Sequence, residues 1–264
     1  MEFRLNKIEG RISPLIKKII DDESLDTISM TERKLLSYFF AAQLVRVKQL
    51  RNTYKQMNSV VTDLVEKLGF DPKNNPDLNK DEEDIKASSI LDLEKHVNGL
   101  APYFFNKDWI LFKAPDNHLY YISDNPVTLH NNIDYGPRGN LGLAVKGIQI
   151  YFPISKSYCL GFICESYKEI IDKKFIKLGL INKFAINPKL YTYQEQIESI
   201  NYKYSVETGK AYQSKPENVI HKNILQVINS TRFLFSANDD FDLAKKIVKD
   251  HPELKNPPQI QHNP

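Results

Sequence analysis

Apolar residues near the N-terminus recur three and four positions apart, which is the spacing of an amphipathic helix. The pattern runs from Leu5 to Ile20 and is interrupted by Pro14. A proline inside a helix removes a backbone hydrogen bond and bends the chain. We therefore expect one kinked helix or two short ones in this segment.

The strongest pattern in the chain is a heptad repeat between Ser29 and Gly69. Ser29-Met30-Thr31-Glu32 has the form of a capping box, and Gly69 is a typical C-terminal cap. The residues between them alternate spacings of four and three: Leu36, Phe40, Gln43, Val47, Leu50, Tyr54, Met57, Val61, Leu64 and Leu68. This pattern predicts one helix of about 38 residues, roughly 57 Å long. Its seam needs a partner, either elsewhere in this chain or in a homodimer formed through the long helix.

A polar linker with two prolines follows at residues 70–82. A shorter helix is predicted from Asp81 to Val97, and Gly99 closes it. This helix is the expected antiparallel partner of the C-terminal half of the long helix.

Short apolar runs then predict a sheet. Trp109–Ala114 and Leu119–Val127 are expected to pair as strands joined by a turn, and the second run ends in the polar sequence Ser-Asp-Asn-Pro. Ile148–Pro153 and Tyr158–Ile163 predict a third and a fourth strand. The residues from 130 to 147 between them are expected to form a long loop.

The C-terminal part returns to helices. Ser214-Lys215-Pro216-Glu217 resembles a second capping box with proline in the first turn. The helix that it opens has a predicted apolar face of Val219, Ile220, Ile224, Val227 and Ile228. Residues 232–236 predict a fifth strand, and a last small helix capped by Asp239 or Asp240 is expected to end near Asp250.

Together these elements predict an α+β fold, with a long helical hairpin packed on a small mixed β-sheet of about five strands and helices on one side. Residues 1–254 are expected to form a single domain, with a helical part at 1–100 and a sheet part with helices at 101–254. The tail at 255–264 is rich in proline and glutamine and is predicted to be disordered.

Composition narrows the function classes only slightly. With 36 basic and 33 acidic residues the net charge is +3, so nucleic-acid binding is weakly supported. No apolar run approaches the ~20 residues of a membrane span and no apolar leader is present, so a cytoplasmic protein is expected. Cys159 and Cys164 are five apart in a strand-like run and are expected to be buried thiols. The sequence identifies no cofactor.

Asp124 is the candidate catalytic residue, because it ends a strand before the long loop, where sheet proteins commonly place reactive groups. Asn125 is extended by the following Pro126 and is a candidate substrate contact. Asp124 acts as a general acid or base in the functional interpretation. In the structural interpretation it accepts backbone N–H groups in an Asx turn. The sequence leaves both open.

Four further side chains are candidate substrate contacts. Gln149 and Lys146 lie at the next predicted strand, and Gln43 and Arg46 lie one turn apart on the long helix. The alternative for the helical pair is structural: a polar seam residue sets helix register, and an arginine reaches an acidic neighbour.

Metal and nucleophile motifs are weak. A metal-dependent nuclease needs two or more converging carboxylates, and only Glu9 and Asp134 could supplement Asp124. No two histidines share a helix at i, i+4 spacing, so no metal site is predicted. The chain also has no Gly-rich phosphate loop ending in Lys-Ser/Thr and no Gly-x-Ser-x-Gly elbow.

Several short motifs together resemble a known family. They are Ile8-Glu9, Gln43-Leu44-Val45-Arg46, Ser123-Asp124-Asn125-Pro126-Val127, Phe152-Pro153-Ile154-Ser155 and a closing pattern of polar and aromatic residues from Asn223 to Phe241. This set is similar to the bacterial family catalogued as domain of unknown function 4238, over roughly Leu5 to Leu254. The resemblance implies no activity, substrate or cofactor. It also implies that this chain lacks the family's N-terminal block with a His-Tyr-x-Pro-like motif, and so is a truncated or divergent member.

Two hypotheses of function follow. The first is a hydrolase or nuclease-like enzyme centred on the Ser-Asp-Asn-Pro turn, with Asp124, Gln43 and Arg46 converging in one pocket. The second is a non-catalytic binding or interaction protein that uses the long helix and the 130–147 loop as its surface.

Overall fold

The computed structural model describes residues 2–47, 59–72, 82–136, 141–167, 169 and 193–255. The middle of the predicted long helix at 48–58 and the predicted tail after Lys255 lie outside the described residues.

The described chain begins with helices, continues with five strands and then alternates helices and short strands. The helices are α1 (Glu2–Asp22), α2 (Met30–Val45), α4 (Glu82–Phe105), α6 (Tyr193–Thr208), α7 (Pro216–Asn229), α8 (Asp242–Asp250) and the 3-10 helix η4 (Pro252–Lys255). The strands are β1 (Asp108–Lys113), β2 (Ile122–Ser123), β3 (Thr128–Asn131), β4 (Ile148–Pro153), β5 (Tyr158–Ile163), β6 (Tyr212–Gln213) and β7 (Leu234–Phe235).

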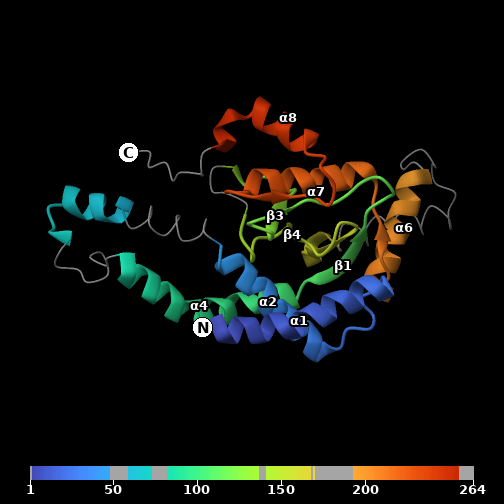
Figure 1. Cartoon of the computed structure of the whole chain (residues 1–264), viewed down its shortest axis with the longest axis horizontal. Helices are drawn as coiled ribbons and strands as arrows, with labels where there is room; N and C mark the ends of the chain where they lie inside the picture. The colour runs from blue at the N-terminus through green and yellow to red at the C-terminus, as the bar shows by residue number, and fades with distance from the viewer. Residues whose placement is uncertain are drawn as a thin grey trace.

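A five-stranded mixed sheet lies between two helical layers (Figure 1). Its order is β3-β4-β5-β1-β6, and only the β1–β6 pair is parallel. The predicted α+β class and five-stranded sheet are confirmed. The prediction of helices on one side is wrong, because α1, α2 and α4 cover one face while α6 and α7 cover the other (Figure 1). Every residue of β4 and β5 is buried, so both faces need a cover.

Aromatic packing under α2 forms the larger core. The ring of Phe40 lies with its centroid within 6.2 Å of the ring centroids of Phe104, Trp109, Phe152 and Phe162. Tilted and edge-to-face contacts of this kind add about 0.5–1.5 kcal/mol per pair beyond the area that they bury. The α1, α2 and α4 layer is therefore fixed to the sheet through one residue of α2 and its neighbours.

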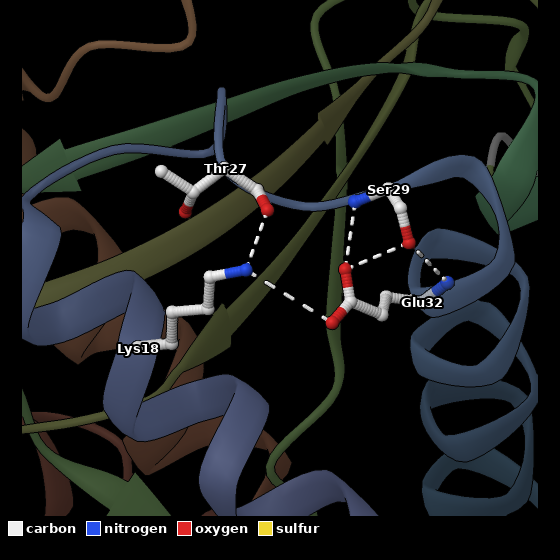
Figure 2. Close-up of polar contacts among 4 residues, drawn as sticks. All are labelled: Lys18, Thr27, Ser29 and Glu32. Atoms are coloured by element: carbon white, nitrogen blue, oxygen red, sulfur yellow. Dashed lines mark hydrogen bonds and ion pairs between the residues drawn. The ribbon is translucent and has the colours of Figure 1, made fainter.

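The start of α2 is capped as predicted. Figure 2 shows Ser29 Oγ accepting the Glu32 backbone N–H at 3.3 Å, while Glu32 Oε2 accepts the Ser29 backbone N–H at 2.8 Å. The Ser29 hydroxyl also donates to this carboxylate, which lowers the pKa of Glu32. Lys18 of α1 donates to the Thr27 carbonyl at 2.6 Å and lies 4.0 Å from Glu32, so α1 contacts the same cap.

The end of α2 differs from prediction, since the helix stops at Val45 with Arg46 as its C-cap. The expected continuous helix to Leu68 is therefore wrong, and a separate helical stretch occupies 59–67. A heptad seam holds a long rod only where another helix covers it. The later seam residues are 44%, 41% and 68% exposed in the described structure: Val61, Leu64 and Leu68.

Helix α4 packs along α2, which is the N-terminal part of the predicted long helix and not the C-terminal half expected as its partner. It also runs beyond its predicted end at Val97 to Phe105. Gly99 does not stop it, because its φ is not positive and it therefore lacks the left-handed conformation of a C-terminal cap. The last turn is instead closed by Trp109, whose Nε1 donates to the Phe104 carbonyl at 2.9 Å.

Several strand pairings were not predicted. The β2 strand pairs with β7 in a separate two-stranded sheet instead of forming a hairpin with β1. The neighbours of β1 are β5 and the two-residue β6. Strand β3 pairs with β4 and overlaps the start of the segment at 130–147 that was predicted as a long loop. The predicted third and fourth strands match β4 and β5 in their bounds.

Helix α7 buries polar residues, and its predicted apolar face is correct only in part, because Val219 and Val227 are buried as predicted. Ile220 and Ile228 are 40% and 45% exposed, whereas Lys222, Asn223 and Gln226 are buried. The predicted Ser214 cap is also wrong, because Lys215 is the N-cap and makes no side-chain cap bond. The reason lies in the segment that α7 covers, whose backbone groups need partners.

The first of these partners is Asn223. Its Oδ1 accepts the Tyr121 backbone N–H at 2.8 Å, and its Nδ2 donates to the Leu119 carbonyl at 2.8 Å. These backbone groups lie in a segment predicted as strand that is not part of the five-stranded sheet. The buried amide thus supplies the hydrogen bonds that a neighbouring strand would supply.

Gln226, one turn further, continues the same arrangement. Its Oε1 accepts both the backbone N–H and the hydroxyl of Ser123 at 2.9 Å, and its Nε2 donates to the Pro126 carbonyl at 2.9 Å. Together with Asn223 it fixes the rotation of α7 about its own axis relative to the sheet.

We predict that Gln226→Leu lowers the free energy of unfolding by about 2–5 kcal/mol, because the backbone groups of Ser123 and Pro126 lose their buried partner. Chemical denaturation monitored by circular dichroism measures this change. The matched control is Gln213→Leu, whose side chain is exposed, and its effect should stay within about 0.5 kcal/mol. Equal effects of the two variants would contradict the role given to Gln226.

Candidate functional site

The Ser-Asp-Asn-Pro turn is bound to the segment after α7. Asp124 Oδ1 accepts the Thr231 backbone N–H at 2.9 Å, and Oδ2 accepts the Thr231 hydroxyl at 2.6 Å. Asn125 is buried and donates from Nδ2 to the Asn229 carbonyl at 2.6 Å. Both carboxylate oxygens of Asp124 are therefore engaged in joining two loops, which accords with the structural interpretation of this turn.

The candidate residues of α2 lie elsewhere. Arg46 forms an ion pair with Glu9 of α1. This agrees with the structural alternative, in which Arg46 reaches an acidic neighbour. Gln43 is buried within α2. Among the described residues no hydrogen bond or ion pair joins Gln43 or Arg46 to Asp124.

The side chains of Lys146 and Gln149 lie in different environments. The side chain of Lys146 is exposed, and its carbonyl accepts hydrogen bonds from Asn131 Nδ2 and the Tyr135 hydroxyl. Gln149 is buried on β4 and faces a cavity under α7. Of the candidate residues named from the sequence, Gln149 is the one that lines this cavity.

The cavity lies between α7, the sheet and α6 and has a volume of about 200 Å³. Half-exposed and exposed side chains such as His130, Asn132 and Asn218 line it together with buried ones. The remaining lining residues are Phe112, Gln149, Tyr151, Ile163, Tyr167, Tyr202, Tyr212, His221 and Lys222. We call it the α7 cavity.

Lys222 is the most unusual residue in the α7 cavity. Only 4% of it is exposed, and its Nζ lies 4.1 Å from the Phe112 ring centroid and 4.7 Å from that of Tyr151. It donates a long hydrogen bond of 3.4 Å to the Asn218 carbonyl. Burial lowers the pKa of Lys222 from 10.5 to about 8, so near pH 8 both the ammonium and the free amine are present.

Two histidines meet at the same cavity. The rings of His130 on β3 and His221 on α7 are in edge-to-face contact with centroids 4.5 Å apart. Burial and the neighbouring His130 and Lys222 lower the pKa of His221, so its imidazole is neutral at pH 7. His130 Nε2 lies 2.6 Å from Asn132 Oδ1 and donates to it, which fixes the ring and leaves Nδ1 as the second functional atom.

Phenol groups supply further donors. The Tyr151 hydroxyl donates to Gln149 Oε1, and the Tyr202 hydroxyl is buried without a hydrogen-bond partner among the described residues. Burial raises the pKa of both tyrosines, so they stay protonated at neutral pH. A buried hydroxyl without a partner is costly, and a bound ligand or water would satisfy it.

The chemistry of the described lining is that of a site for anions. None of its side chains carries a carboxylate, and Lys222, the imidazoles, the amides and the phenols can all donate hydrogen bonds. In the described parts of the chain no group of three or more His, Cys, Asp or Glu residues could hold a metal ion. Within the same ranges, no helix combines the length and the apolar character needed to cross a bilayer.

Sequence reasoning missed His221 and Lys222 because it assigned the isoleucines of α7 to the buried face. One signal was available. Lys222 and Gln226 are four residues apart and so share one stripe of the helix. A polar stripe of that kind predicts either a solvated face or a buried polar site, and the structure shows the second.

We predict that Asp124→Ala lowers the free energy of unfolding by about 1–3 kcal/mol, because Thr231 loses both hydrogen bonds to the carboxylate. Thermal and urea denaturation measure the change. Asp239→Ala removes an exposed carboxylate and should have almost no effect. A fully stable Asp124→Ala variant would argue against the structural role.

A second prediction concerns pH. Folded Lys222 releases its proton near pH 8, whereas the unfolded side chain keeps it up to about pH 10.4. Unfolding therefore takes up a proton in this window, and the contribution of Lys222 to stability rises with pH. Lys222→Met has no such group. From pH 7.5 to pH 9.5 the free energy of unfolding of the natural chain should therefore rise by about 1–2 kcal/mol relative to that of Lys222→Met. A difference between the two that stays constant would show that Lys222 titrates outside this window.

Comparisons with known proteins concern the family of this chain and assign it no activity. Searches among curated proteins and among solved structures found no match. The family model described as "Protein of unknown function (DUF4238)" matches residues 1–240, which is most of the chain and includes both the Ser-Asp-Asn-Pro turn and the α7 cavity. This chain therefore belongs to the DUF4238 family of proteins of unknown function.

Proposed function

We propose that this chain is a hydrolase that binds a small anionic substrate in the α7 cavity and activates water with the His130–His221 pair. The observation that carries the proposal is that a buried lysine amine and two imidazoles in contact share one cavity. The proposal keeps the hydrolase class expected from the sequence and moves its centre from Asp124 to α7.

The charge of the described lining supports an anionic substrate. Lys222 is the strongest positive group there, and burial strengthens its attraction for an anion because little water screens it. An anion that binds beside Lys222 would in turn favour the charged amine. Gln149 and the Tyr202 hydroxyl are neighbouring groups that can orient the substrate.

The histidine pair supports proton transfer. A neutral imidazole is a suitable general base at pH 7, and the lowered pKa keeps His221 in that form. His130 is held by Asn132, and its ring contacts that of His221 and fixes the position of the general base. A water molecule between this pair and a bound ester is the expected nucleophile.

A panel of small anionic chromogenic esters tests the proposal. It contains phosphate monoesters, phosphate diesters and carboxylate-bearing acyl esters, with labelled DNA and RNA as larger phosphodiesters. Hydrolysis of at least one substrate should persist in EDTA, because imidazole rather than a metal activates the water. His221→Gln should lower kcat/KM on the order of 10²–10³-fold. The control His251→Gln changes an exposed histidine outside the cavity and should leave the rate unchanged.

Cleavage that requires Mg²⁺ or Mn²⁺ and is lost in Asp124→Asn would contradict this assignment and return the site to the Ser-Asp-Asn-Pro turn. The same panel tests the alternative of a non-catalytic interaction protein. That alternative is favoured by the exposed apolar row Val61, Leu64 and Leu68. It predicts binding of anions without turnover, and a homodimer through this region in light scattering.

A further inference from the structure

We infer that the Lys222 amine forms an imine with an anionic aldehyde or ketone that enters the α7 cavity. This covalent site goes beyond the proposed hydrolase, because it requires neither the activation of water nor the histidine pair as general base.

The geometry of Lys222 carries the inference. Its Nζ lies over two aromatic rings inside a cavity, in a lining whose described residues offer no carboxylate to hold the ammonium form. Its one described hydrogen bond, to the Asn218 carbonyl, is long at 3.4 Å. Surface lysines have water on all sides of the charged group, whereas this amine is desolvated and borders an open volume of about 200 Å³.

Desolvation makes the amine nucleophilic at moderate pH. Only the neutral amine attacks a carbonyl carbon, and burial lowers the pKa of Lys222 to about 8. At pH 7 roughly a tenth of such a group is neutral, compared with well under a thousandth of an ordinary lysine. Lys222 is therefore suited to imine formation.

Several elements bring titratable groups close to Lys222. The lining contributes His221 on α7, His130 on β3, Tyr151 on β4, Tyr202 on α6, Tyr212 on β6 and Tyr167, and the buried Cys159 on β5 also acts on Lys222. Burial raises the pKa of the Tyr151, Tyr202 and Cys159 side chains, so these three groups stay neutral near pH 8. Cys159 acts to raise the pKa of Lys222, but burial is the larger effect and leaves this pKa at about 8.

The reaction balances without an added oxidant or reductant. The neutral amine of Lys222 attacks the carbonyl carbon and forms a C–N bond, and the carbonyl oxygen takes a proton to give a carbinolamine. Loss of this hydroxyl as water consumes one proton, which is taken from solvent, and leaves the protonated imine. The positive charge then stays on the nitrogen, where the carboxylate or phosphate of the ligand can balance it.

Reductive trapping tests the inference on the full chain. Glyoxylate is the probe, because it is a small aldehyde with a carboxylate, and cyanoborohydride supplies the hydride that converts the imine to a stable secondary amine. Peptide mass mapping then gives the rate at each lysine. At pH 7 Lys222 should be modified at least about tenfold faster than the exposed Lys156 and Lys210. In denaturant this preference should disappear.

Acetaldehyde, which lacks the anionic group, is the matched probe and should show a smaller preference for Lys222. Lys222→Arg keeps a cation but cannot form an imine, and it should lose only the fast adduct. If that variant does not fold, the map of the natural chain alone decides. Modification of Lys222 at the same rate as the exposed lysines, or no modification of it, overturns the inference. Because the readout is an adduct mass, a failed hydrolase assay does not affect it.

Discussion

Two buried amide side chains of α7 determine how this helix is oriented over the sheet. Asn223 and Gln226 give the segment from Leu119 to Pro126 the backbone hydrogen bonds that no strand of the main sheet provides. Unpaired backbone groups are expensive to bury, so this match fixes α7 in one rotation over the sheet. The rotation decides which other side chains of the helix face inward. It places Lys222 and His221 at the α7 cavity and leaves Ile220 and Ile228 exposed.

The same constraint explains how a lysine comes to be buried. Burying an ammonium group without a carboxylate partner is unfavourable, and the cost appears as a lowered pKa. The rings of Phe112 and Tyr151 offset part of this cost through their negative faces. Residues whose pKa is shifted in this way are common at functional sites. The Ser-Asp-Asn-Pro turn differs, because each polar group of Asp124 has a structural partner.

The sequence predicted well those parts of the structure that depend on residues close together in the chain. The Ser29 cap, β4 and β5 were predicted closely, because a capping box and short apolar runs depend on neighbours in sequence. The pairing of β2 with β7 joins residues more than a hundred positions apart. The covering of both sheet faces also depends on contacts between elements distant in the chain, which periodicity does not encode. Gln149 was found because it lies on a predictable strand. His221 and Lys222 were missed because the hydrophobic rule selects the isoleucines of α7, and only the tertiary need for amide partners reverses that choice.

The central claim is that the functional site of this chain is the α7 cavity and that the Ser-Asp-Asn-Pro turn is a structural joint. The most direct measurement is a nuclear magnetic resonance titration of the full chain with inorganic phosphate at pH 7. The account predicts that the ring protons of His130 and His221 shift together along one saturating curve, while the backbone amides of Ser123, Asp124 and Asn125 do not move. Saturating shifts at the turn with unchanged imidazole signals would contradict the account.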